Sequence, residues 1–380
     1  MSALSEPFHP PPSRDTINGM ATTTAHGPTL TEVTRLGRSA VKVAIISIVA
    51  LMVGRVLLNA LVAYWKATFP PPPPAPTVGF GKLPPIDFAA QDSEDKPTAY
   101  RLEMPTNDFP YFGNRYKVFL IPNAPANLLA DEKVRQLAAK YDFIFEPEAL
   151  GSGERYRWTR SEPLNASLEI ETRTLNFVLQ SDYLAHPELL SQRDLPENYE
   201  AVTRVKNFLA AADLLDYDIA TSSGRVTYLK ALGGELKEAF SLSDADFLQV
   251  DIDRQPVDQK YQFFGPDGKK GVVSAIISGA FSGMDSIVEI EYHHRPVDYF
   301  QVETYPPRDT KAAWQLLQAG EGYIASRGTS KEIVVRDISL GYYESWDEQG
   351  FLQPIYVFIG DGGFVGYVSA VDSTQIQKRN

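Results

Sequence analysis

Side chains that could carry out catalysis or bind a metal are few in this sequence. It contains no cysteine, which excludes disulfides, thiolate metal sites and cysteine nucleophiles. Of its five histidines, only His293 and His294 are adjacent. They fall in a predicted strand, where successive side chains point to opposite faces, so we do not expect them to bind one metal ion together. We expect one ring to point inward and the other to point to solvent.

Acidic residues are more numerous, and one group of them is close together in the sequence. Its members are Asp244, Asp246, Asp251, Asp253 and Asp258. The group lacks the glycine and the distal glutamate of an EF-hand loop, which excludes that kind of calcium site. A weak surface calcium site and a solvated acidic edge remain as alternatives, and the edge is the simpler interpretation.

Two pairs of glutamates have a spacing that could serve glycoside hydrolysis. Glu169 and Glu171, and likewise Glu289 and Glu291, lie on one face of a predicted strand, about 7 Å apart. Charged residues that alternate with apolar ones are also typical of any strand with one face in water. The sequence has no nucleophile-elbow motif and offers no Ser-His-Asp arrangement. We therefore predict no enzyme activity, no catalytic residue, no bound metal and no cofactor.

Aromatic residues are the more suggestive feature, with 19 tyrosines and 20 phenylalanines. The candidate interaction residues among them are Tyr292, Tyr299, Phe300, Tyr342, Tyr343 and Trp346. If they are exposed, they offer a protein or glycan a large contact area at low entropic cost. If they are buried, they form the cores of thin sheets, which is the default expectation.

The elements that must position these residues belong to a largely folded chain. Its 380 residues are 43% hydrophobic and 22% charged, an ordinary globular mixture long enough for two folded units with tails. The net charge of −12 argues against a general nucleic-acid-binding protein. We therefore expect no nucleic-acid partner.

One segment is apolar enough to cross a membrane. Residues 43–65 form a run of 23 with a single charge, and as a helix they would extend about 35 Å, more than a bilayer core of about 30 Å. We predict a transmembrane helix at residues 43–66, which acts as a signal-anchor. A cleaved signal peptide is the competing interpretation, but about 40 residues precede the run and no small-residue cleavage site follows it. A core helix is the third interpretation, and the flanking composition disfavours it.

Charges beside this helix predict its orientation. Arg35, Arg38 and Lys42 precede it, whereas only Lys66 follows it before a run of prolines. The positive-inside rule then places residues 1–42 in the cytoplasm and the large C-terminal head on the extracytoplasmic side of the cell membrane.

Two polar residues lie within the predicted span. Arg55 is near its middle, and Asn59 follows one helical turn later. A central arginine costs about 2.5–3.5 kcal/mol on insertion scales. One interpretation is a partner helix whose carboxylate or carbonyls contact Arg55, and the other is a side chain that extends to the membrane interface.

The segments on both sides of the span have the composition of solvated chain. Residues 1–42 are predicted to form a disordered cytoplasmic tail. Residues 70–74 are five consecutive prolines, and we predict a stiff proline-rich linker over 67–98 that holds the head away from the lipid. Ordered structure is expected from about Tyr100.

The rest of the chain predicts an α+β fold with antiparallel sheets. Helical spacing of apolar residues occurs in 127–143 and 197–215, and a shorter helix is expected over 309–320. Strands joined by hairpins are expected over 116–121, 168–179 with a turn inside, 248–253, 261–264, 272–277, 288–292, 333–343, 354–359 and 364–371. Because the first two helices share their spacing, we predict two helix-on-sheet units, 99–195 and 196–376, that are related by duplication.

The C-terminal end resembles a known family. Its motifs are a helix that ends in glycine (Trp314-Gln-Leu-Leu-Gln-Ala-Gly320), a strand that reads Leu340-Gly-Tyr-Tyr343, and a strand led by proline (Pro354-Ile-Tyr-Val-Phe358) before a closing hairpin. This segment of about 65 residues resembles the final unit of YycI/YycH-type proteins. The resemblance implies a single-pass, extracytoplasmic regulator of a membrane sensor kinase, without catalytic residues. The proline-rich segment followed by Val78-Gly-Phe-Gly-Lys-Leu-Pro84 also resembles uncharacterised envelope proteins of small-genome bacteria.

Together these observations predict a non-enzymatic, membrane-anchored extracytoplasmic protein. Residues 43–66 would contact the lipid bilayer, and the head would bind a membrane or envelope protein, with regulation of a sensor kinase as the most specific version. A binding module for cell-wall glycan or peptide is the first alternative, and an aromatic-lined cleft would be its sign. An exported hydrolase is the second alternative, which needs convergent carboxylates or a metal.

Overall fold

The computed structural model describes most of the chain after the N-terminal segment. The described residues are 30–69, 74–91, 97, 99–106, 108–123, 129–192, 194–268, 271–329 and 332–378. They fall into two units, one that ends at Pro73 and another, called the head below, from Pro74 to Asn380. All the described strands belong to the head.

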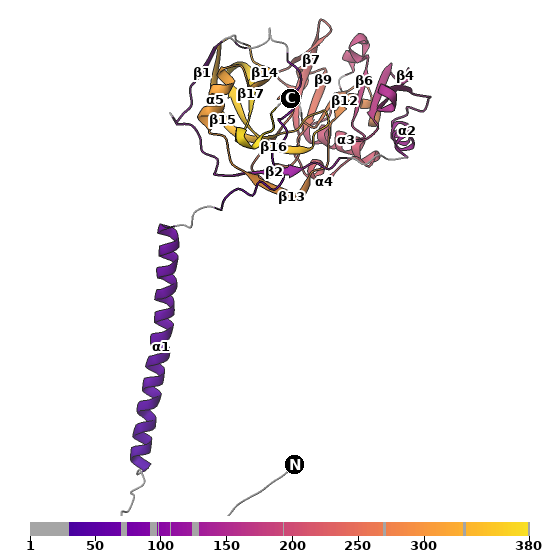
Figure 1. Ribbon diagram of the computed structural model, residues 1–380. Coiled ribbons are helices and arrows are strands. Elements are labelled where there is room, and N and C mark those ends of the chain that lie inside the picture. Colours follow the sequence, from indigo (N-terminus) through magenta and orange to yellow (C-terminus); the bar gives the residue numbers. More distant parts are fainter. Residues whose placement is uncertain are drawn as a thin grey trace, which may run out of the picture. The chain divides into compact units, whose positions relative to one another are not determined.

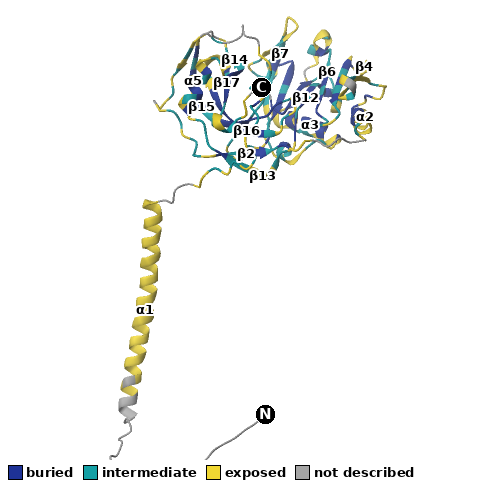
Figure 2. Cartoon of the chain, viewed as in Figure 1, coloured by how far each residue is buried: buried dark blue, intermediate teal, exposed yellow. Residues whose placement is uncertain are grey.

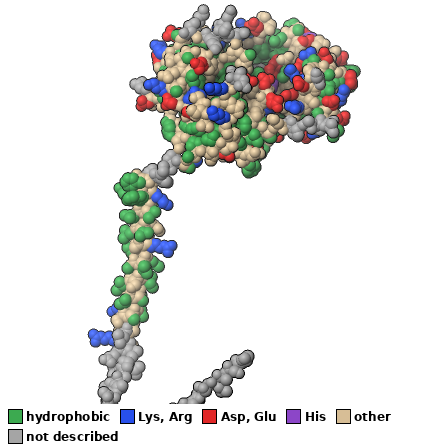
Figure 3. All heavy atoms as spheres, viewed as in Figure 1, with side chains coloured by type: hydrophobic (Ala, Val, Ile, Leu, Met, Phe, Trp, Pro, Cys, Tyr) green, Lys and Arg blue, Asp and Glu red, His purple; other side chains and the backbone are tan. Residues whose placement is uncertain are grey.

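The first unit contains one long helix, α1 (Leu30–Thr68). Its part Gly37–Thr68 is long and apolar enough to cross a membrane, and its most apolar window has no buried residue. Figure 2 shows the described side chains of this helix as exposed, and Figure 3 shows apolar side chains along most of its length. A helix that is apolar on all sides is typical of a membrane span. The structure is therefore consistent with a single-pass membrane protein.

Helix α1 begins before the predicted membrane segment. Residues 30–42, assigned above to a disordered tail, are helical, while residues 1–29 lie outside the described part of the chain. Segment 30–42 contains no proline, and once a helix has nucleated, each added residue gains a backbone hydrogen bond. The tail prediction is therefore corrected for residues 30–42.

Nine of the described strands form one antiparallel sheet. In spatial order they are β3 (Glu148–Leu150), β4 (Arg155–Arg160), β5 (Ala166–Glu171), β6 (Phe177–Ser181), β12 (Ile287–Tyr292), β11 (Val273–Ser278), β9 (Phe247–Ile252), β7 (Arg225–Leu232) and β8 (Glu235–Glu238). Helices α2 (Ala130–Lys140) and α3 (Asn198–Ala211) pack on one face of this sheet, and Figure 1 shows them beside β4, β6 and β12. Their buried side chains, such as Leu137 and Phe208, share one core with the strands.

Eight of the described strands form a second sheet. Five run in the order β1 (Ala99–Leu102), β15 (Glu332–Tyr343), β16 (Phe351–Gly360), β17 (Phe364–Ser369) and β14 (Tyr323–Arg327). The others are β10 (Phe263–Phe264), beside β15, and β2 (Tyr116–Leu120), which pairs with β16 and with β13 (Asp298–Tyr305). Strands β1 and β10 run parallel to β15. The prediction of purely antiparallel sheets is corrected at these two pairs.

Helix α5 (Thr310–Gln318) covers part of the second sheet. Trp314 and Leu317 are buried in the core that this sheet forms. The carboxylate of Asp309 accepts a hydrogen bond from the backbone N–H of Ala312 at 2.9 Å, as expected of a helix cap. The backbone at Gly320 has φ +76°, a conformation that favours glycine and ends the helix.

Most predicted elements are present with shifted ends. Helices α2, α3 and α5 fall in the three predicted helical segments, although residues 124–128 lie outside the described part of the chain. The turn expected within 168–179 is the hairpin between β5 and β6. An α+β fold with one long apolar helix near the N-terminus and a sheet-rich head is thus confirmed.

The two sheets do not follow the predicted units 99–195 and 196–376. Strands β1 and β2 belong to the eight-stranded sheet, whereas β3 to β6 complete the nine-stranded one. The β6–β12 pair joins strands from both sides of the predicted boundary, which is therefore corrected. Helices α2 and α3 each precede a run of antiparallel strands whose last member, β6 or β12, lies at the centre of the sheet. A duplication would produce this arrangement, and it stays a prediction.

Residues 74–91 pack on the head instead of extending as a linker. Leu83 is fully buried beside Val118 and Tyr305, and it pairs with Ile376 in a parallel bridge. Apolar side chains between the prolines gain about 25 cal/mol for each Å² that they remove from water. The linker prediction over 67–98 is therefore corrected for these residues, and residues 70–73 and 92–96 lie outside the described part of the chain.

Candidate functional site

A row of polar side chains crosses four neighbouring strands of the nine-stranded sheet. Arg155 on β4 pairs in register with Glu171 at the end of β5. The backbone N–H of Glu171 donates to the carbonyl of Asn176 at 2.8 Å, which extends the row to the start of β6. The pairing of β6 with β12 places His293 beside Asn176. Because side chains alternate along a strand, all four point to the same side of the sheet.

The opposite face of these strands belongs to the core. Tyr156, Ile170, Phe177 and Tyr292 form the matching row there, and the last three are at most 2% exposed. A slip of one residue would exchange the two faces, so burial of this apolar row fixes the register of the polar one.

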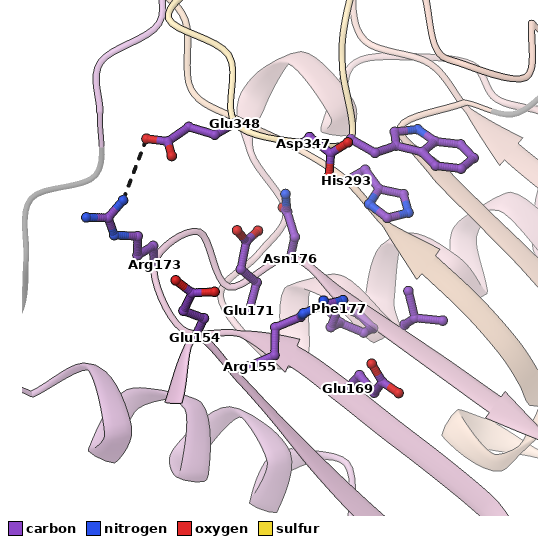
Figure 4. Close-up of a pocket in the computed structure, with 12 residues that line it drawn as sticks. Glu154, Arg155, Glu169, Glu171, Arg173, Asn176, Phe177, His293, Asp347 and Glu348 are labelled. Carbon is purple, nitrogen blue, oxygen red and sulfur yellow. Dashed lines mark ion pairs between the residues drawn. The ribbon is translucent and has the colours of Figure 1, made fainter. Parts of the chain in front are cut away.

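A loop of the other sheet covers the polar row. Residues 344–350, between β15 and β16, place Trp346, Asp347 and Glu348 over it and enclose a groove of about 390 Å³. Figure 4 shows that side chains from the strands and from this loop border one space. The indole of Trp346 stacks on the ring of His293, with centroids 4.7 Å apart and planes at 12°.

This 344–350 loop is braced by the side chain of Gln349. Its Nε2 donates to the carbonyl of Tyr343 at 3.0 Å and to that of Phe351 at 2.8 Å. Its Oε1 accepts from the backbone N–H of Ser345 at 2.9 Å. One amide therefore ties both ends of the loop, and the groove has a fixed wall as well as a fixed floor.

Asn176 is the buried amide of the groove. It is only 5% exposed, yet neither its Oδ1 nor its Nδ2 has a hydrogen-bond partner among the described residues. Figure 4 shows its side chain between Glu171 and His293, directed into the groove. A buried polar group without a partner costs about 1–3 kcal/mol. The sheet therefore holds at this point an amide whose hydrogen-bonding capacity the protein itself does not use.

Carboxylates outnumber guanidinium groups around the groove. Its charged lining residues are Glu154, Glu169, Glu171, Asp347 and Glu348 on the acidic side and Arg155 and Arg173 on the basic side.

Only some of these charges are paired. Glu169 accepts from Arg157 at 2.7 Å, and Glu348 lies 3.6 Å from Arg173. Glu171 lies 3.7 Å from Arg295, which is itself buried. Glu154, Arg155 and Asp347 have no ion-pair partner among the residues that the structure describes. The groove is therefore acidic, with charges of both signs available.

This arrangement suits binding more than chemistry. It combines a free amide, unneutralised carboxylates and a ring surface, within the 300–1,000 Å³ range of ligand pockets. A second hollow of about 320 Å³ shares Glu171, Arg173 and Glu348 with it. No group of three or more His, Asp or Glu side chains that could hold a metal occurs among the described residues.

The predicted aromatic interaction residues are dispersed, and Trp346 is the one that lines the groove. Tyr292, Tyr342 and Tyr343 are at most 2% exposed, so the structure corrects their assignment to an interaction surface. The hydroxyls of Tyr292 and Tyr342 each donate to a backbone carbonyl at 3.1 Å, which allows these polar rings to be buried.

Tyr299 and Phe300 of the head do not line the groove. Phe300 is fully exposed, and Tyr299 packs edge-on against Phe119 with centroids 5.4 Å apart. The β2–β13 register is irregular at this point of β13. Arg55 and Asn59 are exposed on α1.

The acidic group expected at a solvated edge is partly buried. Asp251, on β9, is 3% exposed, and Asp246, which precedes β9, is 4% exposed and accepts a hydrogen bond from the backbone N–H of Ala231 at 3.1 Å. Burial raises the pKa of Asp251, although its carboxylate accepts from the Gln249 amide at 3.1 Å. The prediction of a solvated edge is corrected for these two residues.

A buried ion network joins the two sheets beside the groove. Arg254 follows β9, and its side chain is 2% exposed. Its Nε donates to Oδ2 of Asp218, in the short helix α4 (Tyr217–Ala220), at 2.7 Å. Its Nη1 donates to Oε1 of Glu344, which follows β15, at 2.6 Å, and to the carbonyl of Arg295 at 2.8 Å. This Arg254 network therefore connects the strands of the groove floor to the start of the 344–350 loop.

His294 points away from the groove and into the Arg254 network. Its Nε2 lies 3.1 Å from Oδ1 of Asp218, and its Nδ1 lies 3.0 Å from Oδ2 of Asp216. Burial alone lowers the pKa of His294, but the two carboxylates outweigh it and hold the pKa above its ordinary value. The prediction that adjacent rings point to opposite faces is confirmed. The prediction that one is solvated is wrong, since His293 is 15% exposed under Trp346.

Sequence reasoning did not identify Arg155, Asn176 or Asp347. The alternation of polar and apolar residues along the strands assigns Glu171 and His293 to polar faces, and this pattern was the signal in the sequence that pointed to the groove. Long-range strand pairing aligns the polar row across four strands. It also brings over this row a loop that lies about 50 residues after His293 in the sequence.

Comparisons with known proteins do not indicate a family. No protein-family model and no curated protein matches this chain. Among solved structures it is similar to an uncharacterized protein from Eubacterium rectale ATCC 33656, with a TM-score of 0.33 and 12% identity over 70% of this chain and 86% of that chain. A likeness at this level carries no argument about function. The resemblance to YycI/YycH-type proteins stays a prediction.

Replacing Arg254 by methionine should strongly destabilise the head. The change leaves the buried carboxylate of Glu344 without its ion-pair partner and removes one of the two cationic partners of the part-buried Asp218. Breaking a buried pair in this way costs about 3–5 kcal/mol. We expect the free energy of unfolding, measured for the full chain in detergent by urea denaturation, to fall by about this amount. The control Arg135→Met removes a half-exposed guanidinium that pairs with the exposed Glu146 and should cost about 1 kcal/mol or less. Equal losses in both variants would contradict the role of the network.

The stabilisation by His294 should decrease as pH rises. Its pKa is higher in the folded than in the unfolded protein, so the stabilisation is complete below about pH 6.5 and is lost as pH rises through the folded pKa. We expect the loss of unfolding free energy in His294→Gln to be larger at about pH 6 than at about pH 9. The pKa values of Asp216 and Asp218 are lowered, so both stay ionised over this range. A loss that is the same at both pH values would refute the charged state of His294.

Proposed function

We propose that this protein is a non-enzymatic, membrane-anchored protein whose head lies on the extracytoplasmic side and binds a membrane or envelope protein. The observation that carries the proposal is helix α1, whose apolar part has no protein cover among the described residues and would be covered by a lipid bilayer. The excess of Lys and Arg on its N-terminal side supports the orientation. Regulation of a sensor kinase is the most specific form of the proposal, and it rests on the resemblance of the C-terminal strands.

Within this proposal, Arg55 is the contact for a partner helix. It is exposed in the middle of the apolar stretch, where a carboxylate or carbonyl of another helix would offset the cost of its charge. Asn59 lies one turn further along the same side and would add a hydrogen bond between helices.

A second candidate function is the binding of a cell-wall glycan or peptide by the head. The groove favours it, because Trp346 and His293 present stacked rings beside the free amide of Asn176. The hydrolase alternative is not proposed further, since no observation favours it.

Cysteine labelling should establish the membrane topology. The natural chain has no cysteine, so a single introduced thiol reports one position without background. In intact cells, a membrane-impermeant maleimide should label Ser243→Cys, an exposed position of the head. It should label Thr24→Cys only after the membrane is opened. The reverse pattern would contradict the proposed orientation, and labelling of both positions in intact cells would contradict a membrane span.

Removal of Arg55 should release a membrane partner. We expect in-cell crosslinking followed by mass spectrometry to recover a defined membrane protein with the natural chain, and at least tenfold less of it with Arg55→Leu. The control Ala50→Leu changes the opposite side of the helix and should retain the partner. Full retention of the partner by Arg55→Leu would move the contact to the head, and recovery of wall material without any enriched protein would refute a protein partner.

A further inference from the structure

We propose that the groove binds a short peptide that carries a free ammonium group. This inference deepens the second candidate function, the binding of wall material by the head, and it rests on that function. It names the ligand class from the groove itself, through the unpaired amide, the excess of carboxylates and the ring surface at one end.

The amide of Asn176 is the first argument. An asparagine side chain presents one acceptor and two donor hydrogens, which match the N–H and C=O of a peptide unit. Because Asn176 is 5% exposed and lacks any partner among the described residues, its pairing capacity is held ready inside the groove. Its Oδ1 and Nδ2 are both buried, so a small side-chain movement in the groove would let a peptide group of a ligand supply both missing hydrogen bonds.

The charge of the groove is the second argument. Asp347 and Glu154 are exposed at its border and have no ion-pair partner among the described residues, so they can accept an ammonium group. Arg155 is equally without an ion-pair partner, and its guanidinium can receive a terminal carboxylate. Two free carboxylates and one free guanidinium favour a zwitterionic peptide with an additional positive charge.

The ring surface is the third argument. Trp346 and His293 stack with planes at 12°, and both line the groove. A methylene chain or small apolar side chain that packs against this pair would lose contact with water. An amino sugar with an acetamido group would also pair with Asn176, but it is neutral and would form no ion pair with Asp347 or Glu154. The peptide is therefore the ligand that uses all the free groups.

Calorimetric titration of the full chain in lipid nanodiscs tests the proposal. The probes are the tripeptide Ala-Lys-Ala, the same tripeptide with both amino groups acetylated, and N,N′-diacetylchitobiose. We expect Ala-Lys-Ala to bind at least tenfold more tightly than either of the other probes. Its affinity should fall as NaCl is raised, since an ion pair at the exposed border is screened by salt.

Variants of the groove separate binding from folding. Asn176→Leu keeps the branched shape of the side chain and removes the unpaired amide, so it should raise the melting temperature of the unliganded protein while weakening the binding of Ala-Lys-Ala at least tenfold. A residue with a purely structural role would instead lower the melting temperature. If this variant does not fold, Asp347→Asn, at an exposed position, should still weaken binding about threefold or more. The control Glu238→Gln on β8, at the other edge of the sheet, should leave the affinity unchanged.

Each remaining outcome overturns the inference. Tighter binding of the acetylated peptide or of the sugar would refute the need for an ammonium group, and the sugar would then be the better ligand class. No binding of any probe would refute the groove as a site for peptides. The cysteine labelling is independent of these titrations, so a failure of the ligand proposal leaves the membrane anchor standing, and a failure of the anchor does not alter the titrations.

Discussion

The head depends on one buried arginine between two sheets. Arg254 donates to carboxylates on both sides, to Asp218 beside the nine-stranded sheet and to Glu344 at the end of β15. Separating a buried charge from its partner costs about 3–5 kcal/mol, so the network favours this arrangement of the two sheets. His293 of the polar row adjoins His294 of this network, and the 344–350 loop begins at Glu344. The Arg254 network therefore also sets the width of the groove.

Alternation along strands lets neighbouring residues serve different regions of the protein. His293 lies under Trp346 in the groove, whereas His294 contacts the carboxylates of the Arg254 network. Ile170 is fully buried in the core, and the next residue, Glu171, points into the groove. The period of two in an extended chain produces both effects. The same short strands therefore supply residues to the core, to the Arg254 network and to the groove, and a one-residue shift in strand register would disrupt all three.

A ligand in the groove would touch both sheets at once. The floor comes from β4, β5, β6 and the end of β12, and the wall comes from the loop after β15. Any ligand that needs both surfaces stabilises their joined arrangement by mass action.

Strong local patterns were readable from the sequence. They include the apolar helix around Arg55, the helices α2, α3 and α5, the hairpins, and the parity that separates His293 from His294. Strands such as β13, which is mostly exposed, and the packing of Leu83 were missed, because their stability comes from distant neighbours and not from local periodicity. Only the tertiary structure decided which strands share a sheet. It therefore also decided that Asn176 and Trp346 line the same groove. Register and cover depend on contacts between residues far apart in the chain, which no local pattern of residues records.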